Sequence, residues 1–307
     1  IKLTQEQIIE TKNTFIHLIY KKMFAWIVDK VNQSFQNSFT LENKKFIGIL
    51  DIFGFEVFKK NGFEQLCINY ANEALQNQFN LWVFKLEQEE YEREQINYKS
   101  IEFPDNSKCI KMLSGKKMSV FTLLNQECMI PKGSDLGFLT KIVKKYKDNQ
   151  YFSTNNRKLS KSQFGIIHYA GNVNYTVEKF CQKNMTKINL EILDSMSFCP
   201  FSFIQDYVKS MKYKKLNKIS SRSILTRFKV QLNSLLKTIG KTNTYYVRCL
   251  KPNDDHVPCL LDKQKVLAQL KYAGVLEAVK VARAGYPIRF TKNIFIDKYS
   301  GFFNKID

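Results

Sequence analysis

Several common functional signatures are missing from this 307-residue sequence. Its seven cysteines form no C-x-x-C pair, which argues against a zinc site or a disulfide framework and for a reducing compartment. Three scattered histidines add no metal signature. The apolar runs are far too short to span a bilayer, and residues 1–20 lack the pattern of a signal peptide. We therefore expect a cytoplasmic protein without a transmembrane segment.

Acidic residues are also scarce, with 28 Asp and Glu against 48 Lys and Arg, so the net charge is +20. Such a balance alone suits nucleic acid, an acidic membrane surface or an acidic protein filament. Much of the charge is concentrated, because residues 207–229 hold eight basic side chains and no acidic one. A solvated loop without a partner remains an alternative. The aromatic residues follow core-like spacing and are not interleaved with the lysines, which disfavours nucleic acid.

A glycine-rich phosphate loop of the form G-x-x-x-x-G-K-[ST] does not occur in the sequence. Residues 46–56 nevertheless indicate nucleotide chemistry. Residues 46–50 form a short apolar run, which predicts a buried strand that ends at Asp51. In nucleotide switches of the form D-x-x-G, the Asp holds a phosphate-bound Mg²⁺, and a glycine such as Gly54 lets its N–H approach the terminal phosphate. Alone, this short pattern is expected about once by chance in a chain of this length.

Hydrophobic periodicity predicts several helices and a smaller number of strands. Pro131 and Gly133 should separate two helices, with Ser134 or Asp135 capping the second. The loop between them carries Met129 and Ile130, which either form an exposed apolar tip or fold into the core. Residues 144–161 should be a basic loop. The expected helices are 7–35, 63–94, the pair within 118–146, 224–240, 263–272 and 274–284, and the expected strands are a hairpin at 163–177 and the strand 245–250.

The full string Asp51-Ile52-Phe53-Gly54-Phe55-Glu56 resembles switch II of the myosin motor. Residues 63–73 resemble the start of the myosin relay helix, and residues 84–91 resemble its end. Further similar stretches, in the same order and at approximately the same spacing, are 168–171, 246–253, 274–277 and 285–289. On these motifs, which span nearly the whole sequence, the chain is identified as a member of the myosin family.

The resemblance implies an α/β fold: the helix-rich C-terminal part of a P-loop NTPase motor, contributing strands to a central twisted sheet. It divides the chain into a long helix before switch II (1–45), switch II with the relay helix (46–100), a lower-cleft actin-binding region (101–206), a lysine-rich surface loop (207–229), a helix, a central-sheet strand and two short coupling helices (230–285), and the start of the converter (286–307). Many myosins carry a reactive cysteine in each short helix, whereas the matching positions here are Tyr272 and Ala282.

The resemblance also implies ATP and Mg²⁺ as cofactors of the full motor. Asp51 would hold Mg²⁺ through water, without a direct metal bond, and the Gly54 N–H would bind the γ-phosphate. Glu56 would pair with a switch I arginine and help position the attacking water. Because the phosphate loop is absent, we expect an actin-activated ATPase only in the full motor and no activity from this fragment alone. The residues implied in mechanical coupling are Phe63, Phe79, Gly274 and Gly285.

The implied partners are actin filaments and the rest of the myosin heavy chain, with light chains outside this fragment, which makes the protein cytoskeleton-associated. A non-motor actin-binding remnant that has lost ATPase activity is the main alternative, and a nucleic-acid-binding protein is a weaker one. An intact switch II favours the motor, because Asp51, Gly54 and Glu56 have no purpose without nucleotide. The residues implied in actin binding are Met129, Ile130, Pro131, Lys132, Lys209, Lys212, Lys214, Lys215, Lys218, Leu232, Lys237 and Asn253.

Overall fold

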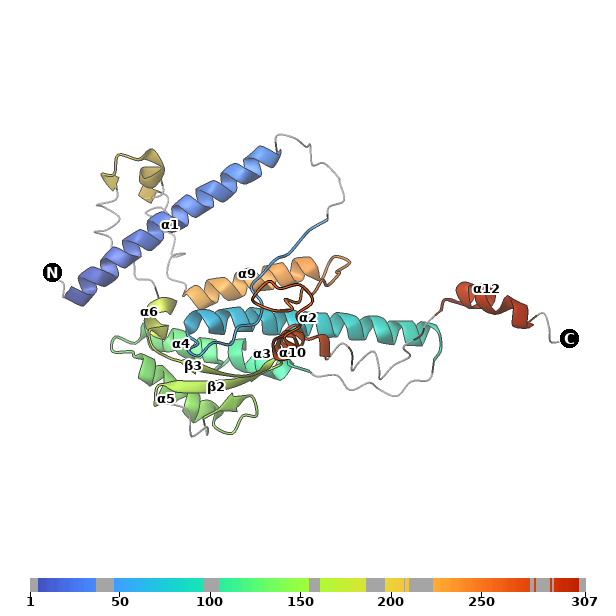
Figure 1. Cartoon of the computed structure of the whole chain (residues 1–307). Helices are drawn as coiled ribbons and strands as arrows, with labels where there is room; N and C mark the ends of the chain where they lie inside the picture. The colour runs from blue at the N-terminus through green and yellow to red at the C-terminus, as the bar shows by residue number, and fades with distance from the viewer. Residues whose placement is uncertain are drawn as a thin grey trace.

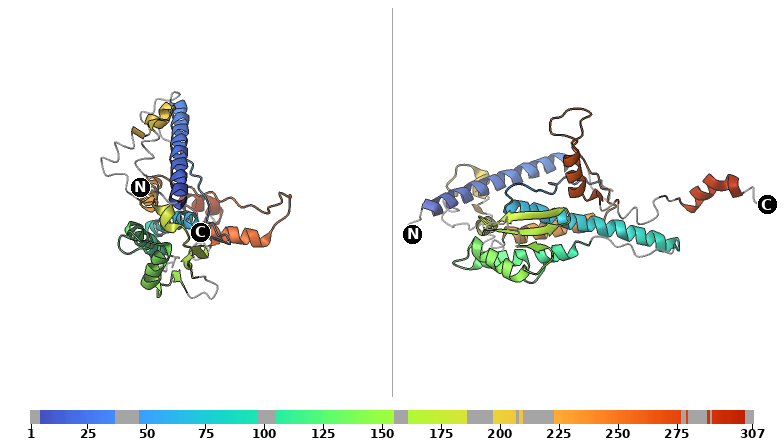
Figure 2. Two further views of the ribbon diagram at one scale, coloured as in Figure 1. Left: turned by 90° about the vertical axis from the view of Figure 1, so that its left-hand side faces the viewer. Right: turned by 60° about the horizontal axis from the view of Figure 1, so that its bottom comes forward.

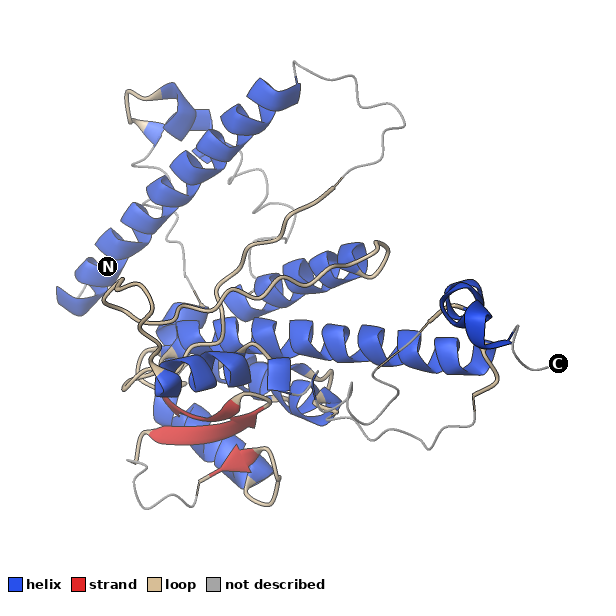
Figure 3. Cartoon of the chain, turned by 45° about the vertical axis from the view of Figure 1, so that its right-hand side comes forward, coloured by secondary structure: helices blue, strands red, loops and turns tan. Residues whose placement is uncertain are grey.

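The computed structural model describes residues 5–36, 47–96, 105–154, 161–185, 197–206, 208–209, 223–276, 279, 288 and 290–303. Helices dominate these residues, and the strands gather on one side of the molecule (Figure 3). The helices are α1 (Gln5–Gln36), α2 (Phe63–Arg93), α3 (Ser107–Ser114), α4 (Val120–Met129), α5 (Asp135–Tyr146), α6 (Phe180–Asn184), α9 (Ile224–Ile239), α10 (Lys263–Tyr272) and α12 (Lys292–Phe303). The strands are β1 (Phe152–Ser153), β2 (Gln163–His168) and β3 (Gly171–Thr176).

Helix α2 is the centre of the packing. Helix α9 lies beside its first half, α3 and α4 lie on the opposite side, and the β2–β3 hairpin runs alongside it (Figures 1 and 2). Leu66 and Tyr70 of α2 are buried in a core that these elements share. Burying such apolar side chains supplies most of the favourable free energy of folding.

The three strands form one antiparallel sheet in the order β1-β2-β3. Ile166 lies in the central strand and pairs with Phe152 of β1 on one side and with Val173 of β3 on the other. Phe164 and Ile166 turn inward, and Phe164 contacts the rings of Phe138 and Phe180 from α5 and α6. The sheet therefore closes one side of the core, as the alternating hairpin pattern predicts.

Most of the predicted helices are confirmed. Serine side chains cap α4, α5 and α9 by accepting a backbone N–H in the first turn, namely Ser119, Ser134 and Ser223. Because α9 begins at Ile224, the last six residues of the predicted lysine-rich loop are helical. The predicted helix 274–284 lies largely outside the described residues, and so does most of the loop 207–229.

Two strand predictions are wrong. Residues 47–50 and 245–250 form no strand, and Ile47 and Val247 are 98% and 81% exposed. The only sheet among the described residues is β1-β2-β3, so neither run has a neighbour for its backbone hydrogen bonds. The predicted loop 144–161 is also partly wrong, because α5 continues to Tyr146 and β1 pairs with β2.

Helix α1 has the predicted length but exposes its apolar side chains, including Ile16, Phe24 and Trp26. Among the described residues, no helix combines the length and hydropathy that crossing a membrane requires.

Candidate functional site

The loop at residues 51–58 presents one open end and one anchored end. Asp51 is exposed, and neither it nor the Gly54 N–H has a hydrogen-bond partner among the described residues. A Cβ added at Gly54 would meet no atom within 4 Å. The Asp51 carboxylate and the Gly54 backbone therefore have room for a ligand.

Helix α2 holds the other end of this loop through its backbone. The Glu56 N–H donates to Asn69 Oδ1 at 2.8 Å, and Asn69 Nδ2 donates back to the Glu56 carbonyl at 2.8 Å. Asn72 Nδ2 donates to the Phe53 carbonyl at 3.0 Å, and Gln65 Nε2 donates to Glu56 Oε2 at 3.3 Å. A side-chain amide that pairs with both backbone groups of one residue fixes that residue, so Glu56 is held against α2.

Phe55 fixes the loop to two further elements. Its ring is buried, with centroid distances of 5.3 Å to His168, 5.5 Å to Tyr169 and 5.6 Å to Tyr272. The first two residues belong to the end and turn of the hairpin, and Tyr272 ends α10. The loop, the hairpin and α10 thus meet around one aromatic side chain.

Beneath this contact lies a buried polar chain that the sequence analysis missed. Asn69 Nδ2 donates to the Tyr175 hydroxyl at 2.9 Å, and that hydroxyl lies 2.9 Å from His168 Nε2. His168 Nδ1 lies 2.8 Å from Glu73 Oε2, and Asn106 Nδ2 donates to Glu73 Oε1 at 2.8 Å. A neutral His168 satisfies every contact when Nδ1–H donates to Glu73 and Nε2 accepts from Tyr175. Burial raises the pKa of Tyr175, and this effect exceeds the opposing effect of the Asn69 hydrogen bond. The hydroxyl therefore stays protonated.

The same chain continues to α10. The Tyr169 N–H donates to Glu73 Oε2 at 3.3 Å, and the Tyr169 hydroxyl donates to the Tyr272 carbonyl at 2.8 Å. Burial raises the pKa of Tyr169, so this hydroxyl also stays protonated. Arg248 Nε donates to the Ala273 carbonyl at 3.0 Å, which holds the same end of α10 from another side.

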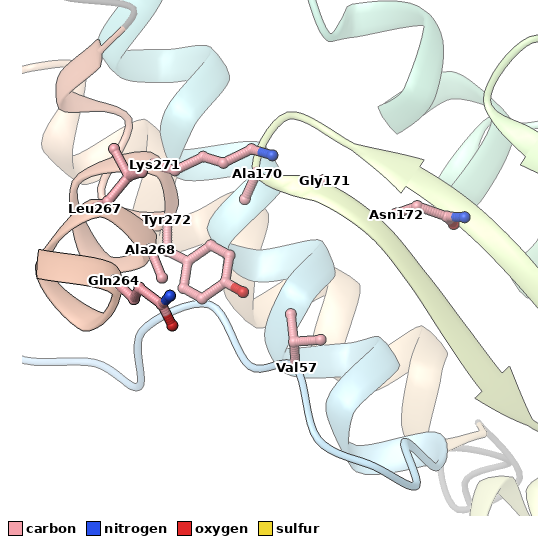
Figure 4. Close-up of a pocket in the computed structure, with 9 residues that line it drawn as sticks. All are labelled: Val57, Ala170, Gly171, Asn172, Gln264, Leu267, Ala268, Lys271 and Tyr272. Carbon is pink, nitrogen blue, oxygen red and sulfur yellow. The ribbon is translucent and has the colours of Figure 1, made fainter.

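A cavity of about 370 Å³ lies where the hairpin tip faces α10 (Figure 4). Lys271 reaches from α10 to the hairpin tip, whereas the Tyr272 ring points toward the side where Val57 of the loop lies. The cavity marks the place where loop, hairpin and α10 adjoin without filling all the space between them.

Glu73, Cys109 and His168 bring three ligand-type atoms within 4.8 Å of one another. Hydrogen bonds already account for all three, because both nitrogens of His168 are engaged and the Cys109 thiol faces the Ile167 carbonyl at 3.8 Å. Burial, followed by the Glu73 charge, raises the pKa of Cys109, which disfavours the thiolate that a metal requires. The cluster is therefore structural.

A separate apolar tip joins α4 to α5. Met129 and Ile130 are 75% and 45% exposed, so the alternative that they fold into the core is wrong. Glu127 supports the tip from below: its Oε1 accepts the Ser134 N–H at 3.0 Å, and its Oε2 lies 2.5 Å from Lys141 Nζ. Burial raises the pKa of Glu127, but the Lys141 and Ser134 hydrogen bonds outweigh it, so the pKa lies below its ordinary value.

Comparison with known proteins decides the family. The sequence profile of the myosin head (motor domain) family matches residues 1–306. The chain belongs to the myosin head family. It is 37% identical to unconventional myosin-Vb of Rattus norvegicus, covering 97% of this chain and 17% of that protein. It is 40% identical to Protein OPAQUE1 of Zea mays (92% and 18%) and 37% identical to the myosin-I heavy chain of Dictyostelium discoideum (94% and 12%).

Two of the residues that the myosin resemblance assigns to actin binding are buried inside this chain. Leu232 is buried in α9. Asn253 is buried too, and its Nδ2 donates to the carbonyls of Val257 and Leu260 at 2.8 and 2.9 Å. Pro131, Lys132, Lys209 and Lys237 are exposed, whereas Lys212, Lys214, Lys215 and Lys218 lie outside the described residues.

The four positions expected to couple a myosin switch to its lever differ in their surroundings. Phe63 is buried against Phe180. Phe79 is half-buried beneath Tyr246, with ring centroids 4.7 Å apart. Gly274 has a φ of 68°, and a Cβ there would come within 2.4 Å of the Gln76 side chain, so glycine is required both for its conformation and for the close approach to α2. Gly285 lies outside the described residues.

Proposed function

We propose that residues 1–307 form the nucleotide-responsive and filament-binding part of an ATP-driven, actin-based motor. Membership of the myosin head family supports a motor function. The chain spans only 12% to 22% of the length of the relatives it matches, so the activity and partners of the whole protein belong to this proposal.

The open end of the loop is suited to the nucleotide. Asp51 offers a hard carboxylate oxygen of the kind that Mg²⁺ and its water ligands prefer, and the backbone at Gly54 is unobstructed. Bound Mg²⁺ would neutralise charge on the phosphates. In this proposal Asp51 holds a water of the metal, the Gly54 N–H binds the terminal phosphate, and Glu56 pairs with an arginine of switch I.

The anchored end carries the proposal. The peptide at Glu56 is paired to Asn69 of α2, and Phe55 of the same loop lies between the hairpin and Tyr272 of α10. A phosphate that draws Gly54 inward would therefore act on α2 through the part-buried hydrogen bonds of Glu56, and on α10 through the buried ring of Phe55. Such contacts transmit a displacement because a closely packed protein interior has low compressibility. Switch II, relay helix and coupling helix are the roles that we assign to the loop, α2 and α10.

The filament would bind elsewhere on the surface. Met129, Ile130 and Lys132 give an apolar tip with a basic border, and Lys209 begins the lysine-rich stretch. Apolar tips and basic patches are complementary to an acidic filament surface with hydrophobic pockets. We retain Lys237 as a peripheral contact and exclude the side chains of Leu232 and Asn253, because they are buried.

The test is Glu56→Ala in the full-length motor. We expect ATP hydrolysis to fall by at least about 10²-fold, because a positioning and charge-stabilising group is lost. The Kd for ATP should change far less, because Glu56 acts through closure and not through the phosphate cradle. Glu64→Ala is the matched control: Glu64 makes only an exposed ion pair with Lys183 and should leave both quantities unchanged. Equal losses of binding and turnover in Glu56→Ala would contradict the assignment.

A further inference from the structure

Two cysteines from different helices meet at the base of the apolar tip. Cys128 lies in the last turn of α4, and Cys181 lies in α6, which packs against α4 (Figure 1). In its thiol form Cys128 donates to the Cys181 carbonyl at 3.6 Å, and Asn184 Nδ2 donates to Cys128 Sγ at 3.6 Å. Both cysteines are free, and each residue is only partly buried.

The surroundings of the pair shift the pKa values of the two thiols in opposite directions. The neighbouring Cys181 side chain, together with the hydrogen bond from the Asn184 amide, favours the charged form of Cys128 and outweighs burial and the charges of Asp135 and Glu127. The pKa of Cys128 is thereby lowered to about 7, whereas that of Cys181 is raised. The lowered pKa increases the thiolate fraction of Cys128 at neutral pH, and the thiolate is the reactive form.

We propose that Cys128 and Cys181 are an oxidative modification site, which hydrogen peroxide converts to a disulfide between α4 and α6. The Cys128 thiolate attacks one peroxide oxygen, the O–O bond breaks, and hydroxide leaves, giving the sulfenic acid. The sulfur of Cys181 then attacks the Cys128 sulfur, the S–O bond breaks, and the hydroxyl leaves as water with the Cys181 proton. A thiol reductant restores both cysteines.

The bond would act on the support of the tip. Residue 128 directly precedes Met129, and Asp135 of α5 already accepts the N–H groups of Lys179 and Cys181 at 2.6 and 2.9 Å. A disulfide would add a covalent link to a junction where α4, α5 and α6 are hydrogen-bonded. The formation of this disulfide does not depend on the proposed motor function. Only an effect of the disulfide on filament binding would depend on it.

The test is peptide mapping of the full chain after hydrogen peroxide treatment at pH 7, with the remaining thiols blocked. Trypsin should release residues 118–132 joined to residues 180–183, each of which contains one cysteine, and dithiothreitol should separate them. In Cys181→Ala the joined peptide should vanish, and Cys128 should instead accumulate as a dimedone-reactive sulfenic acid. Cys259→Ala, which removes an exposed cysteine elsewhere, should leave the joined peptide unchanged.

A second readout keeps the proposal testable if a variant folds poorly. The rate of Cys128 alkylation against pH should have its midpoint near 7 in the parent, below the value of about 8.5 for an ordinary thiol. The midpoint should rise in Cys181→Ala, because the neighbouring side chain that most favours the thiolate is removed. Oxidation of the parent to sulfenic acid without the joined peptide would overturn the proposal, and so would an alkylation midpoint above 8.

Discussion

Individual buried residues hold the loop at residues 51–58 against the rest of the molecule. Glu73, His168 and Tyr175 are all buried, yet each polar atom of the chain that they form has a partner. A satisfied buried network specifies one arrangement, because any other leaves desolvated groups without hydrogen bonds. The position of Asn69, and with it the peptide at Glu56, therefore depends on residues of the hairpin.

Tyr175→Phe tests this dependence. Removing the hydroxyl leaves Asn69 Nδ2 with one acceptor fewer and His168 Nε2 without a donor in a buried site. We expect the free energy of unfolding, measured by urea denaturation, to fall by about 1–3 kcal/mol. Tyr245→Phe is the matched control, since Tyr245 is 88% exposed, and its effect should stay within about 0.5 kcal/mol. Similar values for the two variants would contradict the structural role of the network.

Glu127 should make part of the stability depend on pH. Its folded-state pKa is lowered, so its contribution is fully present above the unfolded value of about 4.3 and is lost as the pH falls through the folded value. Glu127→Gln should lower the free energy of unfolding at pH 7 by about 1–3 kcal/mol, because hydrogen bonds to a charged carboxylate are lost. The difference from the parent should shrink as the pH falls from 5 to 3.

Thermal denaturation of both proteins across this pH range would measure the effect. Glu178→Gln is the control, because Glu178 makes an exposed ion pair with Lys60, and such pairs contribute little. Parallel stability curves for the parent and Glu127→Gln would show that the Glu127 carboxylate does not support the tip.

At the scale of elements, the tip between α4 and α5 and the lysine-rich stretch should act on filament binding in different ways. Long-range attraction from lysines raises the association rate and fades as salt shortens the Debye length to about 8 Å near physiological ionic strength. A docked apolar contact instead slows dissociation and depends little on salt. The two elements can therefore be separated by kinetics.

We expect Met129→Ser with Ile130→Ser to weaken actin binding of the full-length motor at every salt concentration, through faster dissociation. Replacing the five lysines at 209, 212, 214, 215 and 218 with Gln should slow association, chiefly at low salt. Stopped-flow mixing with actin filaments at two salt concentrations measures both rates. If the lysine variant associates as fast as the parent at low salt, the stretch is a solvated linker.

For the whole molecule, we expect the lack of a phosphate loop in this sequence to limit the activity of residues 1–307. In the proposed function Asp51, Gly54 and Glu56 would supply one side of a nucleotide site, and the sequence contains no phosphate-cradling loop. Residues 1–307 expressed alone should therefore show neither tight ATP binding nor hydrolysis. Isothermal titration with Mg-ATP and a phosphate-release assay with actin filaments measure the two quantities. Actin-stimulated turnover by this chain would contradict the prediction.

Much of the fold was predictable because its helices are specified locally. Periodicity and caps predicted α2, α4, α5 and α9 within a few residues of their observed ends, and alternation predicted the hairpin. The strands predicted at 46–50 and 245–250 failed for the opposite reason: an apolar run becomes a strand only when a neighbouring strand lies beside it, and no local pattern supplies one.

The sequence by itself determined the family, the motif at residues 51–56 that resembles switch II, and the concentration of positive charge. Only the tertiary structure decided which residues hold that motif, because the contacts join distant positions: Glu73 and His168 are 95 residues apart, and Asn69 and Tyr175 are 106 apart. In the sequence His168 is one of three scattered histidines, and Cys128 and Cys181 are unrelated. Folding brings each set together, since hydrogen bonds and thiol pairs depend on distance in space and not on spacing along the chain.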